Sequence, residues 1–214
     1  MEFNVDTSEL QFFLKAVTIN AKKIINKSID SYNHLFQIDA GQAQEIHCEL
    51  GDALEKKGNY DGAVKSYQKI LVSDPNNVPV LFKLGKIYTR LGLTKEALEV
   101  LKKVTMLDDH IPEAFYLLGS VYFSIDANDD AQIALKKAVA LNPGYADAFY
   151  KLGLIADAKN NHDAAIEAYL KTIAFKPDFI KAYQSLGFAY EAKGMRDEAV
   201  KYFKKSMEVE EKQG

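Results

Sequence analysis

A Leu-Gly pair recurs in this chain every 34 residues, and this recurrence limits the possible folds more than any other feature. The pairs are Leu50-Gly51, Leu84-Gly85, Leu118-Gly119, Leu152-Gly153 and Leu186-Gly187. An alanine stands twelve positions after each glycine, and a large apolar or aromatic residue follows four positions later, without insertion or deletion. Self-similarity at a fixed period of this length is typical of repeat proteins. We therefore predict five units, at residues 44–77, 78–111, 112–145, 146–179 and 180–213.

Each unit is predicted to contain two helices joined by a tight turn. In the third unit, Phe115, Leu118 and Tyr122 recur at i, i+3 and i+7, the spacing of an apolar stripe on a helix. Between the two predicted helices stands a residue type that tolerates a left-handed backbone. These residues are Gly58, Gly92, Asp126, Asn160 and Gly194. We expect the glycine of each Leu-Gly pair to lie opposite the alanine twelve positions later, where small residues let the helices approach closely.

The Leu-Gly pair, the alanine, the aromatic residues and the prolines at Pro75, Pro143 and Pro177 resemble the tetratricopeptide repeat, a 34-residue helix–turn–helix. The resemblance covers residues 44–214. It implies an all-α fold, an α-solenoid that winds as a right-handed superhelix. In such a stack the first helix of each unit lines a concave groove, and the second helix covers the convex back.

Residues 1–43 fit the repeat poorly, although apolar residues recur in them at about the helical period. We expect amphipathic helical structure here, and three interpretations remain open. The segment caps the first unit, or it is a degenerate repeat that docks into a neighbouring molecule, or it lies on an anionic membrane surface. The residues that we expect to mediate self-association are Leu10, Phe13, Val17, Ile24 and Ile25.

At the other end of the repeats, the last unit is predicted to leave one side uncovered. No further solvating helix follows the fifth unit, so the side around Val200 and Met207 is expected to meet water or a partner. Because terminal units of a solenoid must hide their open face, this arrangement favours self-association.

Composition argues against several classes of protein. Lys and Arg number 27 against 30 Asp and Glu, so the net charge of −3 does not favour nucleic-acid binding. The single cysteine, Cys48, excludes an internal disulfide and fits a reducing compartment. No apolar run approaches the ~18–20 residues that cross a bilayer, and the start of the chain lacks the features of a signal peptide. We expect a cytoplasmic protein whose membrane association, if any, is peripheral.

The sequence contains no residue pattern typical of an active site. The four histidines lie far apart and form no i, i+4 pair for a metal. Residues 126–130 resemble the start of a calcium loop, but Ala131 stands where glycine is needed and Lys137 where a bidentate glutamate is needed. No glycine-rich phosphate-binding loop occurs. We expect no enzyme activity, no cofactor and no metal.

A protein-binding groove is predicted instead. The resemblance implies that positions 2, 5, 9, 12 and 13 of each unit face the groove, and position 5 is aromatic in three successive units. The candidate groove residues are Phe82, Lys86, Arg90, Tyr116, Phe123, Tyr150, Leu154 and Phe188. A concave apolar strip of this kind suits an amphipathic helix or an extended peptide. The alternative is that these side chains are semi-buried packing residues.

Two functions follow from these features. The first is a self-assembling scaffold, a homo-oligomer in which the N-terminal segment of one copy occupies the groove of the next and which recruits other proteins. Such a contact is heterologous and generates rings or open polymers. The second is a monomeric adaptor that binds a peptide or helix of a partner protein in the groove. Both functions require a protein partner.

Overall fold

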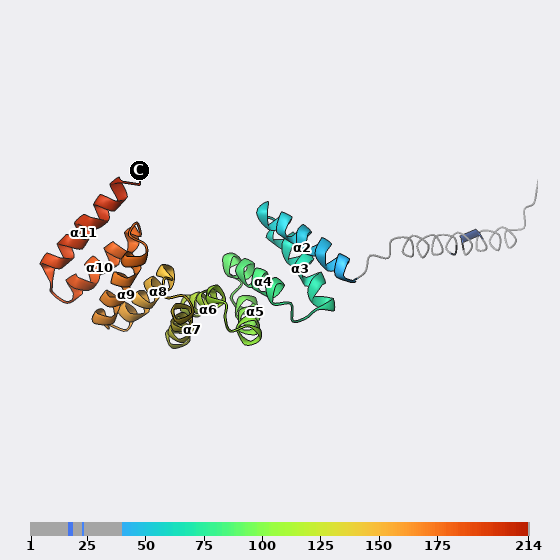
Figure 1. Ribbon diagram of the computed structural model, residues 1–214, viewed down its shortest axis with the longest axis horizontal. Coiled ribbons are helices and arrows are strands. Elements are labelled where there is room, and N and C mark those ends of the chain that lie inside the picture. Colours follow the sequence, from blue (N-terminus) through green and yellow to red (C-terminus); the bar gives the residue numbers. More distant parts are fainter. Residues whose placement is uncertain (1–16, 19–22, 24–39, 214) are drawn as a thin grey trace, which may run out of the picture. The chain divides into compact units, whose positions relative to one another are not determined.

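The structure, a computed structural model, describes residues 17–18, 23 and 40–213, and all regular structure in them is helical. The helices are α2 (Ala40–Lys56), α3 (Tyr60–Ser73), α4 (Val78–Leu91), α5 (Thr94–Leu107), α6 (Pro112–Ser124), α7 (Asn128–Leu141), α8 (Ala146–Ala158), α9 (His162–Phe175), α10 (Ile180–Ala192) and α11 (Arg196–Glu211) (Figure 1). The chain divides into two compact units, residues 1–46 and 47–214. The predicted all-α solenoid is confirmed.

The first of these two compact units contains the residues named for self-association. Val17 is helical and 49% exposed, so its side chain is accessible. Leu10, Phe13, Ile24 and Ile25 lie outside the described residues. Among the helices that the structure describes, none combines the length and the apolar character needed to cross a membrane.

The helices of residues 47–214 follow the 34-residue period. α4, α6, α8 and α10 begin at Val78, Pro112, Ala146 and Ile180, the first residues of four predicted units. The chain reverses after the first helix of each unit through a left-handed residue, as predicted. The φ angles are 75° at Gly58, 69° at Gly92, 59° at Asp126, 56° at Asn160 and 76° at Gly194. A left-handed residue at this point ends one helix and lets the next begin at once.

The glycine of each Leu-Gly pair makes its closest approach to the large residue of the second helix. A Cβ atom on Gly85 would lie 2.6 Å from Leu101 Cδ2, and one on Gly119 would lie 2.7 Å from Leu135 Cγ. Leu101 and Leu135 are themselves fully buried. The large side chain of the second helix thus fills the space that the glycine leaves, and at Gly119 the carbonyl oxygen of the alanine, Ala131, also lies 3.1 Å from the Cβ position.

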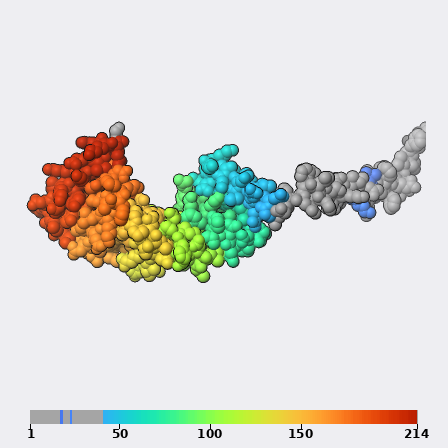
Figure 2. All heavy atoms as spheres, viewed as in Figure 1, coloured from blue at the N-terminus to red at the C-terminus, as the bar shows by residue number. Residues whose placement is uncertain are grey.

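Successive helices stack in chain order. The first helices α4, α6, α8 and α10 each pack between two second helices, so that α8 contacts both α7 and α9, and α10 contacts both α9 and α11. First helices of neighbouring units also contact each other directly, α4 with α6 and α6 with α8. This arrangement places the first helices on the inner side of the stack. Figure 2 shows a hollow in the surface between the green and the orange segments.

Candidate protein-binding groove

Two aromatic residues of α6 and a lysine of α8 form a cluster, which we call the central cluster: Tyr116, Phe123 and Lys151. Lys151 Nζ lies 5.9 Å from the centroid of the Tyr116 ring and 5.6 Å from that of the Phe123 ring. Both rings are partly buried, and the Tyr116 ring also lies 4.9 Å from the ring of Tyr145. A cation over aromatic faces at these distances is favourable. The structure thus brings two predicted groove residues together around a cation.

Burial sets the protonation behaviour of the central cluster. It lowers the pKa of Lys151, although the nearby Asp147 carboxylate acts in the opposite direction. Burial likewise raises the pKa of the Tyr116 hydroxyl, and Asp147 adds to that effect. Lys151 was not among the predicted groove residues because it stands at position 6 of its unit, one residue beyond the expected position. A lysine, Lys83, stands at the same position two units earlier, and this recurrence is the sequence signal that could have identified position 6.

Tyr150 and Leu154 of α8 lie further along the stack and are more involved in packing. The Tyr150 ring lies 4.9 Å from the Phe179 ring and 5.7 Å from the Tyr169 ring. Its hydroxyl lies 3.4 Å from Ser185 Oγ in the next unit. Leu154 packs against the same core cluster as Tyr150. These two side chains therefore connect units four and five as well as contributing surface.

The remaining aromatic candidates have opposite surroundings. Phe82 packs against two core clusters and is partly buried. Phe188 is 62% exposed, and its ring meets the Phe203 ring edge to face at a centroid distance of 5.0 Å. Phe82 thus contributes mainly to packing, whereas Phe188 offers an accessible ring near the last unit.

The first two units carry a polar site instead of an aromatic one. Lys83 Nζ lies 2.5 Å from Asp52 Oδ1, and the Tyr67 hydroxyl donates to the same oxygen at 2.5 Å and to Glu55 Oε2 at 3.2 Å. Burial opposes ionisation of Asp52, but the hydrogen bonds from Lys83 and Tyr67 outweigh it and lower the pKa of this carboxyl. Burial and the acceptor Asp52 raise the pKa of the Tyr67 hydroxyl strongly.

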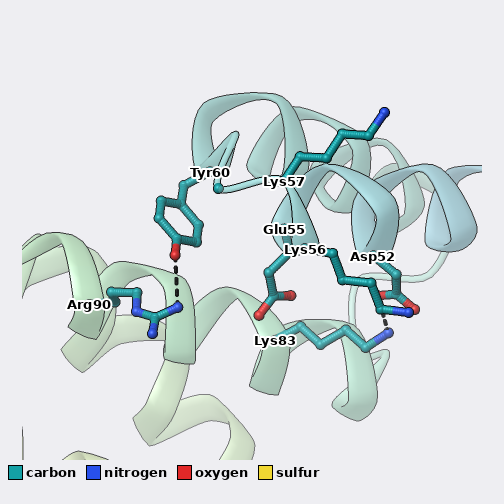
Figure 3. A pocket seen from close by; sticks show the side chains of 8 residues that line it. Asp52, Glu55, Lys56, Lys57, Tyr60, Lys83 and Arg90 are labelled. Atoms are coloured by element: carbon teal, nitrogen blue, oxygen red, sulfur yellow. Dashed lines mark hydrogen bonds and ion pairs between the residues drawn. The ribbon is translucent and has the colours of Figure 1, made fainter.

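An open pocket of about 690 Å³ lies beside this polar site. Its lining residues are Asp52, Glu55, Lys56, Lys57, Gly58, Tyr60, Lys83 and Arg90 (Figure 3). Arg90 Nη1 donates to the Tyr60 hydroxyl at 2.7 Å, which fixes the guanidinium at the pocket wall. Lys86 and Arg90 line a neighbouring pocket of about 450 Å³ with Leu117. The two predicted basic groove residues therefore lie together, at a pocket that also holds the Glu55 carboxylate.

The described residues show no arrangement for metal chemistry. No group of three or more His, Cys, Asp or Glu side chains in that part of the chain is placed to hold a metal ion. Cys48 Sγ lies 3.6 Å from Lys83 Nζ and is half-buried. The candidate groove residues and their neighbours offer aromatic faces, ammonium groups and carboxylates, and these groups suit the binding of a polypeptide.

The sequence matches two family models. Residues 20–178 match the C-terminal ARM domain of tetratricopeptide repeat protein 21, and residues 180–213 match the tetratricopeptide repeat itself. Comparison with curated proteins gave no match.

Solved structures of MamA are similar to this chain. A crystal structure of MamA protein is 55% identical with a TM-score of 0.75, over 81% of this chain and 94% of that one. A second crystal structure of MamA is 57% identical with a TM-score of 0.74, over 77% and 96%. MamA from Desulfovibrio magneticus RS-1, from residue 41 to its end, is 28% identical with a TM-score of 0.76, over 82% and 99%. The chain therefore belongs to the tetratricopeptide repeat proteins and, within them, to the MamA family.

Proposed function

We propose that this protein is a self-assembling scaffold that recruits other proteins to the cytoplasmic face of the magnetosome membrane. Its tetratricopeptide fold and its similarity to MamA are those of a protein-interaction scaffold, not of an enzyme. The observation that carries the proposal is the central cluster, in which Tyr116 and Phe123 are partly exposed on the inner helices. A cation that lies over two aromatic rings provides apolar contact and positive charge at one place.

The proposed occupant of the groove is the N-terminal segment of a second copy. This segment supplies apolar residues, Leu10, Phe13, Val17, Ile24 and Ile25, for the aromatic faces. Acidic residues, Glu2, Asp6 and Glu9, precede them in the sequence. Opposite charges are available on Lys86, Arg90 and Lys151, which we assign to the groove. Complementary charge fixes the register of a bound peptide and speeds its encounter with the groove.

The double variant Tyr116→Ala, Phe123→Ala in the full chain tests this contact. We expect the mass of the assemblies, measured by light scattering, to fall toward that of the monomer. The matched control is Ile133→Ala with Phe175→Ala, which removes a 69% exposed and a 52% exposed side chain from the second helices α7 and α9. If the groove variant keeps the mass of the original chain, the self-assembly proposal is wrong. A chain that is monomeric in both forms and loses a protein partner on groove mutation would instead be an adaptor.

The membrane part of the proposal rests on the similarity to MamA, which is associated with magnetosomes. It needs a separate experiment, in which a fluorescent fusion of the chain is expressed in a magnetotactic cell. We expect fluorescence along the magnetosome chain. We also expect the fusion to co-sediment with purified magnetosomes and to be released from them by a high-salt wash. A fluorescence signal spread evenly through the cell would contradict the assignment.

A further inference from the structure

A pocket of about 340 Å³ lies between the second helices α7 and α9. The first helix α8 contacts both of them (Figure 1). Three α8 residues, which share one helix face, line the pocket together with two residues of α7 and one of α9: Phe149, Leu152, Ala156, Gln132, Lys136 and Ala168. None of the candidate groove residues is among its lining residues. The pocket is thus a surface feature separate from the groove.

The pocket lies where a tyrosine of the repeat is missing. Position 11 of the fourth unit is Ala156, whereas units two, three and five have a tyrosine there: Tyr88, Tyr122 and Tyr190. In those three units the leucine of the Leu-Gly pair is 2%, 7% and 0% exposed. In the fourth unit this leucine, Leu152, is only partly buried. The small side chain of Ala156 therefore leaves open a space that a tyrosine ring occupies in other units.

The surroundings of the missing ring are present. In units two and three, the tyrosine meets position 25 of the preceding unit. Gln68 Nε2 donates to the Tyr88 hydroxyl at 3.4 Å, and Lys102 Nζ lies 5.5 Å from the centroid of the Tyr122 ring. Position 25 of the third unit is Lys136, which lines the pocket. An aromatic ring in the pocket therefore meets the Lys136 ammonium group as Tyr122 meets Lys102, and such a contact is favourable.

The α7 side of the pocket carries a polar group at an otherwise apolar position. Position 21 of the third unit is Gln132, whereas the other four units have apolar residues there: Val64, Leu98, Ile166 and Val200. Gln132 is partly buried, and its Oε1 accepts a 3.4 Å hydrogen bond from Lys159 Nζ. Its Nε2 amide can donate to a phenol oxygen in the pocket. This group favours a ring with a hydroxyl over a bare phenyl ring.

The remaining walls suit an aromatic side chain with acidic neighbours. The Phe149 ring is partly buried and stacks on the Phe175 ring at a centroid distance of 5.9 Å, and a further ring can pack against it. At the rim, Lys171 Nζ lies 2.7 Å from Glu167 Oε1, so these two charges balance. Lys136 is exposed and adds a positive charge. The rim is therefore complementary to a segment with negative charge.

We propose that this pocket binds a tyrosine side chain of a recruited protein, on a segment with acidic residues next to the tyrosine. The tyrosine completes the fourth unit as Tyr122 completes the third, with its ring at Lys136 and its hydroxyl at Gln132. A single aromatic anchor in a pocket is a common centre of a protein interface. The inference rests on the recruiting part of the proposed function, and it uses neither the groove nor self-assembly.

The side-chain analogue of tyrosine, 4-methylphenol, probes the pocket directly. We expect millimolar 4-methylphenol to shift the NMR signals of the Leu152 methyl groups in the full chain. The methyl signals of Leu118 should not move, because Tyr122 occupies the equivalent space there. Leu152 signals that stay unchanged, or that move only together with those of Leu118, would overturn the proposal.

Ala156→Tyr supplies the missing ring from the chain itself. It should abolish the effect of 4-methylphenol on Leu152 and raise the midpoint of urea denaturation, because a filled space stabilises the fold. Ala140→Tyr is the matched control at an exposed site of α7, and it should alter neither property. A Leu152 shift that persists in folded Ala156→Tyr would contradict the assignment of the pocket.

Capped tripeptides test the chemistry of the partner. A peptide with tyrosine between two glutamates should shift the Leu152 signals at roughly fivefold lower concentration than one with tyrosine between two glutamines, since exposed ion pairs contribute little. Replacing the tyrosine by alanine should abolish the shift. Gln132→Leu, which restores the apolar residue of the repeat, should remove the preference for tyrosine over phenylalanine at the centre of the peptide. This variant also tests the site if Ala156→Tyr fails to fold. Binding of 4-methylphenol without binding of the glutamate peptide would reject a polypeptide as the occupant.

The groove variants separate this inference from the proposed self-assembly. Tyr116→Ala, Phe123→Ala should lose assembly and still bind the glutamate peptide at Leu152, whereas Ala156→Tyr should assemble normally and not bind it. If the groove variant keeps its assembly while the peptide binds, self-assembly through the groove is rejected and the pocket stands. If the groove variant loses assembly and the peptide does not bind to the original chain, the pocket is rejected and groove docking stands.

Discussion

The Tyr169 hydroxyl donates a 2.7 Å hydrogen bond to Asp157 Oδ2 across the space beside Gly153, joining the two helices of the fourth unit. Tyr67 reaches Asp52 and Glu55 in the same way beside Gly51 in the first unit. In both units a tyrosine fills the space at the glycine and places its hydroxyl on a carboxylate of the inner helix. The repeat glycine thus serves packing and also lets a buried ring reach a carboxylate of the first helix.

Tyr169→Phe should lower the free energy of unfolding by about 1–2 kcal/mol, because a hydrogen bond to a charged acceptor is lost while the ring stays in place. The measurement is urea denaturation followed by circular dichroism. Tyr190→Phe is the control, since its ring stacks on Tyr202 and no hydrogen bond of its hydroxyl occurs within the described residues. Equal losses in the two variants would show that the Asp157 contact contributes nothing.

Gly85→Ala tests the close approach of the two helices. The new Cβ would lie 2.6 Å from Cδ2 of Leu101, which is fully buried and must move. Overpacking of this kind costs ~1–3 kcal/mol, whereas the helical gain of alanine over glycine is ~1 kcal/mol. We therefore expect a net loss of stability in urea denaturation. Gly144→Ala, where a Cβ would find its nearest neighbour at 3.6 Å, should change stability by less than the Gly85 variant. A stabilised Gly85→Ala would contradict the packing argument.

The repeat frame could be predicted because its signals are local and occur five times. The position of Gly58 between two apolar stripes, for instance, requires only the chain around it. The partner of the glycine could not be predicted in the same way. Ala97 and Leu101 stand four residues apart on one helix and therefore share a face. Which of them meets Gly85 depends on how the helices cross.

The side-chain contacts between neighbouring units could not be predicted from the sequence either. Lys151 lies over Tyr116 and Phe123 because of the angle between α6 and α8. That angle cannot be predicted from the residue spacing within one unit. The same holds for Phe82, whose position in the repeat suits the groove although its ring packs into the core. The sequence predicts which helix faces the groove, and the packing decides how far each side chain is exposed.

Acid should weaken the first unit through Asp52. Its pKa in the folded protein lies below the ordinary value of 3.8. A carboxyl whose pKa falls on folding contributes stability that is present above its unfolded pKa and is lost as pH falls through the folded value. Unfolding measured between pH 7 and pH 2 should therefore show a loss below about pH 4, and Asp52→Asn should remove part of this loss. Asp61→Asn, at an exposed carboxylate of α3, is the control. A pH profile identical in Asp52→Asn and the original chain would contradict this role.

Lys151→Met should stabilise the fold and weaken the groove at the same time. Because burial lowers the pKa of Lys151, the folded state binds its proton less tightly than the unfolded chain does. At pH 7 the charged lysine therefore opposes folding, and removing the charge while keeping an apolar side chain should raise the free energy of unfolding. The gain should shrink as pH rises toward 10.5, the ordinary pKa of lysine, since the original chain then loses the proton as well.

The functional half of this prediction has the opposite sign. The ammonium group lies over the Tyr116 and Phe123 rings, where it can meet a carboxylate of a bound segment. Lys151→Met should therefore reduce assembly in light scattering and make the remaining assembly less sensitive to salt, because fewer charges are left to screen. Lys136→Met on the exposed face of α7 should change neither property. A variant that is both less stable and fully assembled would show that Lys151 only supports the fold. If Lys151→Met is more stable and assembles less well, the Lys151 charge destabilises the fold and contributes to binding.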